Sequence, residues 1–213
     1  MSTYAYDPLL RLTSLAQDVA GTAQDVTSTF SYNPASQIAA RSRSNDAYAW
    51  GGAVALTRVY STNGLNQYTQ SGPVALSYDG RGNLTGSGSQ SYTYTAENRM
   101  KSASGATGGA TLYYDALGRL IEYDTSVSTR FAFDGDELAS EVANPSGAIL
   151  RRYVYGPGDD EPLVWYEGAG ASDKRWLHSD ERGSVVAITN ASGAVSAINS
   201  YDDHGNPGTD VTP

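Results

Sequence analysis

The sequence predicts an all-β protein made of repeated antiparallel β-hairpins that form a curved ribbon or part of a β-shell. A tyrosine-aspartate motif returns about every 20 residues, and 20 residues are enough for two short strands and a tight turn. The chain holds 16 Tyr and 23 Gly against only three Phe, which suits half-buried strands and turns. No segment keeps the apolar spacing of an amphipathic helix.

The repeat is clearest at residues 114–120, where Tyr and Asp are followed by Gly, Arg and Leu. Residues 78–84 and 6–12 copy this pattern, and residues 32–38 and 94–100 keep the tyrosine and the apolar residue six positions later. We place seven residues in the same tyrosine position, which gives the period: Tyr78, Tyr94, Tyr114, Phe133, Tyr155, His178 and Tyr201.

Turn chemistry explains the residue types of the motif. Asp can hydrogen-bond the backbone two residues on, and Gly adopts a positive φ without steric cost. The tyrosine and the apolar residue lie on either side of this turn, so they can meet across the hairpin. We assign this structural role to Tyr6, Asp7, Tyr32, Tyr78, Asp79, Gly82, Tyr94, Tyr114, Asp115, Gly118, Arg119, Tyr155, Gly156, His178, Asp180, Gly183, Tyr201 and Gly205.

The segments between the motifs are expected to be flexible connections within one array that covers residues 1–213. Residues 85–90 and 102–109 consist of Gly, Ser, Thr, Ala and Gln. Residues 14–25 are the one helix candidate, but Gly21 interrupts them and no apolar stripe persists. Little helix is therefore expected.

The charge balance argues against nucleic acid as a partner. The chain has 14 basic and 23 acidic residues, a formal net charge of −9, which opposes a phosphate backbone or an anionic membrane surface. It has no Cys, no signal peptide and no apolar run long enough for a membrane span. Because a repeat begins almost at the first residue, we expect a fragment of a longer protein.

No catalytic, cofactor-binding or metal site is expected, and the sequence predicts that the chain is not an enzyme. It lacks the glycine-rich nucleotide motifs, the serine-hydrolase motif and paired histidines at metal spacing. His178 is expected to be packed or bonded in a turn, and His204 to be exposed in one. Four carboxylate clusters, interpreted as solvated turns with an incidental ion site as the alternative, lie at residues 134–137, 159–161, 180–181 and 202–203.

The aromatic residues leave one alternative function open. Trp and Tyr rings stack on sugars, so Trp50, Trp165 and Trp176 could make the chain a module that binds carbohydrate or a cell surface. Packing within the sheet is the simpler interpretation.

The carboxy-terminal third carries the most specific pattern, at residues 152–158, 161–164 and 178–187. With the Tyr-Asp repeats before it, the chain resembles the Rhs family of YD-repeat proteins, which is related to the C components of insecticidal toxin complexes and to the teneurins. The resemblance divides the array into YD repeats at 1–145 and an Rhs-associated core-like segment at 146–213.

The resemblance implies a structural segment of a bacterial toxin shell, secreted or at the cell surface, that encapsulates or presents a neighbouring toxin domain. Its partners would be flanking shell repeats and that toxin or cargo. The family's Asp-Pro-x-Gly-Leu cleavage motif does not occur before the sequence ends at Pro213, so neither self-cleavage nor a toxin is assigned. Asn206 and Pro207 replace the usual end of the last unit, which we expect to be irregular.

Overall fold

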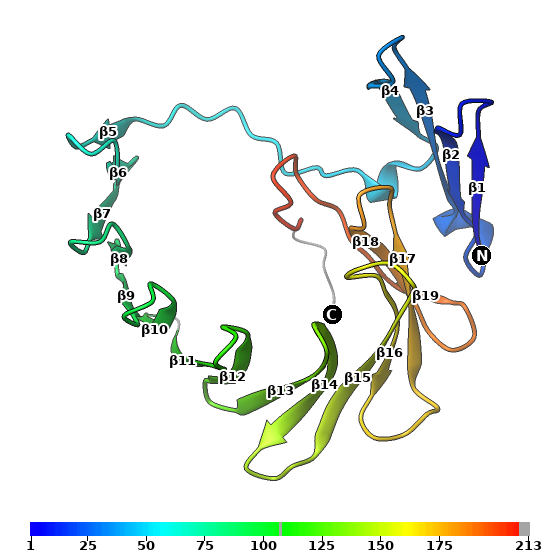
Figure 1. Cartoon of the computed structure of the whole chain (residues 1–213). Helices are drawn as coiled ribbons and strands as arrows, with labels where there is room; N and C mark the ends of the chain where they lie inside the picture. Colours follow the sequence, from blue (N-terminus) through cyan, green and yellow to red (C-terminus); the bar gives the residue numbers. More distant parts are fainter. Residues whose placement is uncertain (107, 209–213) are drawn as a thin grey trace. The chain divides into compact units, whose positions relative to one another are not determined.

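The computed structural model describes residues 1–106 and 108–208, and their regular secondary structure is almost entirely antiparallel β-sheet, which confirms the predicted fold class (Figure 1). Two short 3-10 helices, η1 at Thr22–Gln24 and η2 at Asp46–Tyr48, are the only helical segments among the described residues. Residues 14–25 form part of a strand, a loop and η1, so the expectation of little helix is confirmed.

The strands form two open sheets in which each strand pairs with the next one along the chain. The four-stranded sheet contains β1 (Ser2–Tyr6), β2 (Leu12–Gln17), β3 (Val26–Tyr32) and β4 (Ile38–Arg43). The fifteen-stranded sheet contains β5 (Tyr60–Thr62), β6 (Tyr68–Ser71), β7 (Val74–Tyr78), β8 (Leu84–Ser87), β9 (Gln90–Tyr94), β10 (Met100–Gly105), β11 (Gly108–Tyr114), β12 (Leu120–Asp124), β13 (Ser128–Asp134), β14 (Glu137–Asn144), β15 (Ile149–Tyr155), β16 (Pro162–Glu167), β17 (Lys174–Ser179), β18 (Val185–Thr189) and β19 (Val195–Ile198).

The chain divides into two compact units, and the first holds residues 1–53 together with the described residues from 151 onward. Nearly all of the buried side chains lie in this unit, and β18 is buried along Val186–Thr189. Its buried hydrophobic residues are Leu15, Val19, Val26, Phe30, Tyr48, Val164, Val186, Ala187, Ile188 and Ala197.

Polar contacts join the two distant halves of this first unit. The Gln17 Nε2 donates to the Ser179 carbonyl at 2.9 Å, although 162 residues separate them. The Arg41 guanidinium lies 3.0 Å from the Glu181 carboxylate, and the Ala20 N–H donates to the Gly193 carbonyl at 2.9 Å. The amino-terminal sheet is thereby held on β17, β18 and the turns that flank them.

The second unit, residues 54–150, is a ribbon that contains β5 to β14, and its described residues, 54–106 and 108–150, form no second layer. Among its described residues only Thr129 is buried. Its strands follow one another in order along the ribbon (Figure 1). The stability of this unit therefore rests on hydrogen bonds and half-buried side chains more than on a closed core.

The expectation of flexible connections at residues 85–90 and 102–109 is wrong, because most of these residues are paired strand. Their small side chains suit the ribbon: the hydroxyls of Thr93 and Ser102 lie 2.6 Å apart on neighbouring strands. The hairpin between β8 and β9 turns at Gly88, whose φ is 60°. Serine and glycine here mark tight hairpins, not linkers.

Candidate functional site

One hydrogen-bonded turn recurs nine times along the described residues. In each case a side-chain oxygen accepts the backbone N–H groups two and four residues further on; for Asp115, Oδ1 accepts from Leu117 and Arg119 at 2.9 Å each. The nine residues that supply this oxygen are Asp7, Asn33, Asn63, Asp79, Thr95, Asp115, Asp180, Asn190 and Asp202. We call these the motif turns.

Each motif turn needs a left-handed residue three positions after its side-chain acceptor. Glycine fills this position at Gly82, Gly118, Gly183, Gly193 and Gly205, where φ lies between 82° and 89°. Four non-glycine residues adopt φ of 60–62° at the same place: Leu10, Ser36, Asn66 and Asn98. The glycine of the motif is thus selected by backbone conformation, and the chain tolerates exceptions at some energetic cost.

The carboxylates of Asp7, Asp79 and Asp115 are held in their charged form. The side-chain amide of Asn83, followed by its backbone N–H, lowers the pKa of Asp79. The Arg119 side chain does the same for Asp115, with Nε 2.8 Å from Oδ2. The backbone N–H of Arg11 is the main cause that lowers the pKa of Asp7. These aspartates therefore act as hydrogen-bond acceptors, not as proton donors.

At five motif turns a tyrosine links its hairpin to an earlier one. Its hydroxyl donates to the backbone carbonyl of the residue that follows the preceding motif turn on the same edge of the sheet. The five bonds of this kind are Tyr32 to Leu12 (2.7 Å), Tyr78 to Tyr68 (2.9 Å), Tyr94 to Leu84 (2.9 Å), Tyr114 to Met100 (2.8 Å) and Tyr201 to Val185 (2.9 Å).

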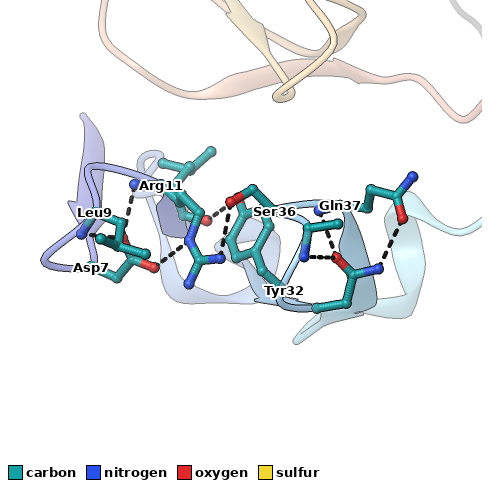
Figure 2. A network of polar contacts seen from close by, with 9 residues as sticks. Asp7, Leu9, Arg11, Tyr32, Ser36 and Gln37 are labelled. Atoms are coloured by element: carbon teal, nitrogen blue, oxygen red, sulfur yellow. Dashed lines mark hydrogen bonds and ion pairs between the residues drawn. The ribbon is translucent and has the colours of Figure 1, made fainter.

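Arginine side chains add a second link between successive motif turns. Figure 2 shows Arg11 reaching from the turn of Asp7 toward Tyr32 and Ser36 of the next turn. Its guanidinium carbon lies 4.7 Å from the centre of the Tyr32 ring. Arg119 is placed in the same way 4.8 Å from the centre of the Phe133 ring. Cations over ring faces are attractive, so the turns of Asp7 and Asp115 are each tied to the next hairpin on the same edge of the sheet.

The tyrosine and the apolar residue of the motif are direct partners across the hairpin. Tyr78 pairs with Leu84, and Tyr114 pairs with Leu120. A register shift immediately before each tyrosine makes room for the five-residue turn.

The structure places Ser179, not His178, in the tyrosine position of the unit around Asp180. Ser179 lies opposite Val185, whereas His178 pairs with Ala187 one step further along β17. The His178 Nε2 is 3.1 Å from the Thr189 Oγ1, and burial lowers the pKa of this histidine. Serine lacks the aromatic ring that marks the other units, so the sequence pattern points to the neighbouring His178.

Two other motif residues belong to turns of a different shape. Tyr155 pairs with Pro162, and the Gly156 N–H donates to the Glu161 carbonyl at 2.8 Å, which closes a longer loop. Phe133 pairs with Leu138, across a tighter turn.

A groove of about 550 Å³ lies on the first unit. Trp176, Leu163, His178 and Thr189 line it from the sheet side, with Asp18 among the residues opposite. Trp176 keeps 41% of its surface exposed, with the Lys174 ammonium 4.9 Å from its ring. Trp165 instead carries Arg151 and Arg175 on its ring and is half-buried, as is Trp50.

The carboxylate clusters found in the sequence lie at turns. Over residues 1–106 and 108–208, no three His, Asp or Glu side chains come together as a metal site would require. His204 is exposed in the turn of Asp202, where its backbone N–H donates to Oδ1. No helix in the described part of the chain has the length and apolar character needed to cross a membrane.

Sequence reasoning missed two motif turns, those of Asn63 and Asn190. In both, threonine stands where the motif has tyrosine, and asparagine replaces aspartate. The available signal was the 16-residue spacing from Asn63 to Asp79, which equals the spacing from Asp79 to Thr95.

Comparison with known proteins gives relatives in sequence and in fold. The chain is 32% identical over 152 residues to the tRNA3(Ser)-specific nuclease WapA of Bacillus spizizenii, and 30% identical over 152 residues to the tRNA nuclease WapA of Bacillus subtilis strain 168. Each match covers 69% of this chain and 6% of the relative, so the chain spans a small part of their length. No family model matches the chain.

Among solved structures, the fold is similar to a component of the crystal structures of TcdB2-TccC3-Cdc42 and TcdB2-TccC3-TEV. In each, 97% of this chain aligns with 15% of the solved chain at 12% identity and a TM-score of 0.58. This likeness concerns the fold alone.

These relatives overturn one expectation from the sequence. The prediction that the chain is not an enzyme is contradicted, because the relatives that match it are named tRNA nucleases. The prediction rests on catalytic motifs that these 213 residues lack. The match covers only 6% of the relative, so the motifs of these residues do not decide the activity of a protein of that length.

Proposed function

We propose that this chain is a wall segment of an Rhs-type YD-repeat shell in a longer bacterial protein that acts as a tRNA nuclease. The observation that carries the proposal is the repeated link between hairpins, in which five motif tyrosines bond the carbonyl that follows the preceding motif turn on the same edge of the sheet. The similarity to the WapA nucleases and the fold shared with the TcdB2-TccC3 structures support it.

The geometry suits a wall. The turn bonds of Asp115 are local and set the shape of one hairpin, whereas the Tyr114 hydroxyl and the Arg119 guanidinium reach neighbouring hairpins. Such links repeat without a closing element, so a ribbon can be extended by adding hairpins. In a longer protein, this ribbon would enclose or present the nuclease region.

Limited proteolysis of the full-length protein tests the wall. We expect the nuclease region to be protected from trypsin, and the double substitution Asp79→Ala and Asp115→Ala to remove that protection because two turns lose their acceptors. Asp136→Ala is the matched control, since Asp136 is an exposed carboxylate at a turn outside the motif set. A nuclease region that is equally accessible with and without intact turns would refute a shell role.

The nuclease part of the proposal is tested with purified tRNA. We expect the full-length protein to cleave tRNA on a denaturing gel, and the same assay on residues 1–213 locates the activity. If the full-length protein cleaves no tRNA, the proposal that it is a tRNA nuclease like its named relatives is refuted.

A second candidate function is glycan binding at the groove beside Trp176, where an exposed indole adjoins Asp18, Thr189 and His178. A ring face next to polar groups is the arrangement that sugar recognition uses. A glycan array should then show saturable binding that is lost in Trp176→Ala and kept in Tyr113→Ala, which removes an exposed aromatic from the other unit. An array with no specific signal would eliminate this candidate.

A further inference from the structure

Three of the motif turns are built on asparagine, and the residue that follows the asparagine differs in each. The three asparagines, at positions 33, 63 and 190, are followed by proline, glycine and alanine. Asn63 and Gly64 form the one Asn-Gly pair in the sequence. The turn of Asn63 therefore differs from turns of the same shape in a way that bears on the chemistry of its side-chain amide.

The backbone nitrogen of the residue after an asparagine can attack the side-chain amide. The nitrogen bonds to Cγ, the bond from Cγ to Nδ2 breaks, and Nδ2 leaves as ammonia with the proton that the attacking nitrogen gives up. Water then opens the cyclic imide at either of its carbonyls, which yields aspartate or isoaspartate. Glycine favours the attack, because it has no Cβ to hinder the approach of its nitrogen.

The motif turn activates the Asn63 amide for this attack. Its Oδ1 accepts the backbone N–H of Leu65 at 2.9 Å and that of Gln67 at 3.0 Å. Two donors on one carbonyl oxygen stabilise the negative charge that this oxygen gains during attack on its carbon. Asn63, Gly64 and Leu65 are exposed, so water reaches the imide as soon as it forms.

The turn of Asn33 has the same bonds but lacks the nucleophile. Its Oδ1 accepts the backbone N–H groups two and four residues further on at 3.0 Å each, and its Nδ2 donates to the Gln37 Oε1 at 2.9 Å. The Asn63 Nδ2 donates in the same way to the Gln67 Oε1 at 2.8 Å. Because Pro34 has no N–H, the neutral imide cannot form at Asn33. The chain thus contains its own matched control.

Glycine after the motif residue is not sufficient by itself. Asp79 is followed by Gly80 and accepts the same two backbone bonds, but its side chain is a carboxylate. The Asn83 side-chain amide lowers the pKa of Asp79, so the protonated acid that a nucleophile can attack is scarce. Amide and glycine occur together only at Asn63.

We propose that Asn63 is a site of spontaneous deamidation in the folded protein, with the Gly64 nitrogen as nucleophile. This inference goes beyond the proposed function and does not rest on it. The aspartate product preserves the turn, because five other motif turns use aspartate as the acceptor. The isoaspartate product disrupts the turn, because it adds a carbon to the main chain and displaces the side-chain acceptor.

The position of the turn in the sheet determines what isoaspartate would change. The turn joins β5 to β6, and β5 is the end strand of the fifteen-stranded sheet, paired with β6 alone among the described strands. The pairing begins next to the turn, with Thr62 opposite Tyr68. Isoaspartate at position 63 should therefore release β5 from the sheet and speed amide hydrogen exchange there.

Peptide mapping of the folded, full-length protein tests the inference. The protein is incubated at mildly alkaline pH and digested with trypsin, which yields a peptide of residues 59–81, and fragmentation in the mass spectrometer distinguishes Asn63 from Asn66. We expect conversion at Asn63, little at Asn190 and none at Asn33. Methyl transfer by protein-isoaspartate methyltransferase identifies the isoaspartate product.

Gly64→Ala is the matched variant. Apart from its chain neighbours, nothing lies within 4 Å of a Cβ built at position 64, and Gly64 is not among the glycines with positive φ, so alanine fits the turn. The variant should lose most of the conversion, because the new methyl group hinders the nitrogen. Equal conversion in Gly64→Ala and the unaltered protein overturns the inference, as does conversion of Asn63 only after unfolding in urea.

Asn63→Asp reproduces the other product and separates the two effects. Its hydrogen exchange in β5 and β6 should equal that of the fresh, unaltered protein, whereas protein enriched in isoaspartate should exchange faster there. Faster exchange in Asn63→Asp would overturn the assignment of aspartate as the product that preserves the turn.

Discussion

Leu10 shows what the left-handed position of a motif turn demands of a single residue. Its φ is 61° and 83% of its surface is exposed, where the other turns often have glycine. Because a left-handed conformation costs a non-glycine residue roughly 1 kcal/mol, Leu10→Gly should raise the free energy of unfolding by about that amount. Urea denaturation measures the change.

The control for this prediction is Leu9→Gly. Leu9 is also exposed, at 70%, but it is not among the residues with positive φ. Glycine there only adds freedom to the unfolded chain, so stability should fall or stay the same. If Leu9→Gly and Leu10→Gly change the free energy of unfolding equally, the left-handed conformation of Leu10 is not what costs stability.

Charge at the motif turns predicts a loss of stability in acid. The pKa of Asp79 and of Asp115 is lower in the folded protein than the ordinary value of 3.8, because amide and guanidinium groups bond the carboxylates. A lowered folded pKa means that the contribution is complete above 3.8 and is lost as pH falls through the folded value. Thermal melts at decreasing pH should show this loss, and Asp115→Asn should reduce it.

Asparagine is a suitable replacement because Asn33, Asn63 and Asn190 already accept the same two backbone bonds. The variant therefore keeps the two backbone bonds of the turn at neutral pH, and it removes the titration together with the ion pair to Arg119. An acid profile identical to that of the unaltered protein would show that Asp115 takes no part in it.

Between elements, the tyrosine hydroxyl is the link that can be removed with the least disturbance. Tyr114→Phe deletes the donor to the Met100 carbonyl and keeps the ring, so the free energy of unfolding should fall by roughly 0.5–1.5 kcal/mol. Tyr92→Phe is the control, since Tyr92 lies on the same face outside the motif position. Similar losses in both variants would argue against a special role for the motif hydroxyl.

How far the elements follow from sequence depends on how local their bonds are. The turn of Asp115 closes within five residues, so Asp, Gly and the flanking Tyr and Leu are enough to predict it. The turn of Asn63 uses the same bonds but lacks the preceding tyrosine, and Ser179 hides its position in the same way. The small residues from Ser102 onward predicted a flexible connection, but Ser102 lies in β10, because small side chains also suit closely paired strands.

At the scale of the whole molecule, the first unit depends on side-chain contacts between residues far apart in the chain, and these contacts cannot be predicted from sequence patterns. Gln17 bonds Ser179 and Arg41 bonds Glu181 across more than a hundred residues, and neither Gln17 nor Arg41 belongs to the motif. The side chains that share one face of the ribbon could not be assigned from alternation alone, because the register shift before Tyr78 and before Tyr114 reverses the alternation along the strand. Only the observed pairing shows which side chains share it.

The uneven burial of the two units predicts uneven stability. Val164, Val186 and Ile188 lie in a core in the first unit, while Thr129 is the single buried residue among the described residues of 54–150. Hydrogen exchange followed by mass spectrometry should therefore find the slowest amides in β16 to β18 and faster exchange along β5 to β8. Ile188→Ala should lower the free energy of unfolding of the first unit by roughly 2–5 kcal/mol.

Exchange in the Ile188→Ala variant distinguishes two units from one cooperative body. Because Ile188 is buried within the first unit, exchange in the described residues of 54–150 should remain unchanged while that of β2, β3 and β16 to β18 rises. Ala75→Gly, in the ribbon, is the reciprocal control and should speed exchange only in β6 to β8. A uniform rise across residues 1–208 in either variant would mean that the ribbon and the core unfold together, since a shared transition exposes every amide at the same rate.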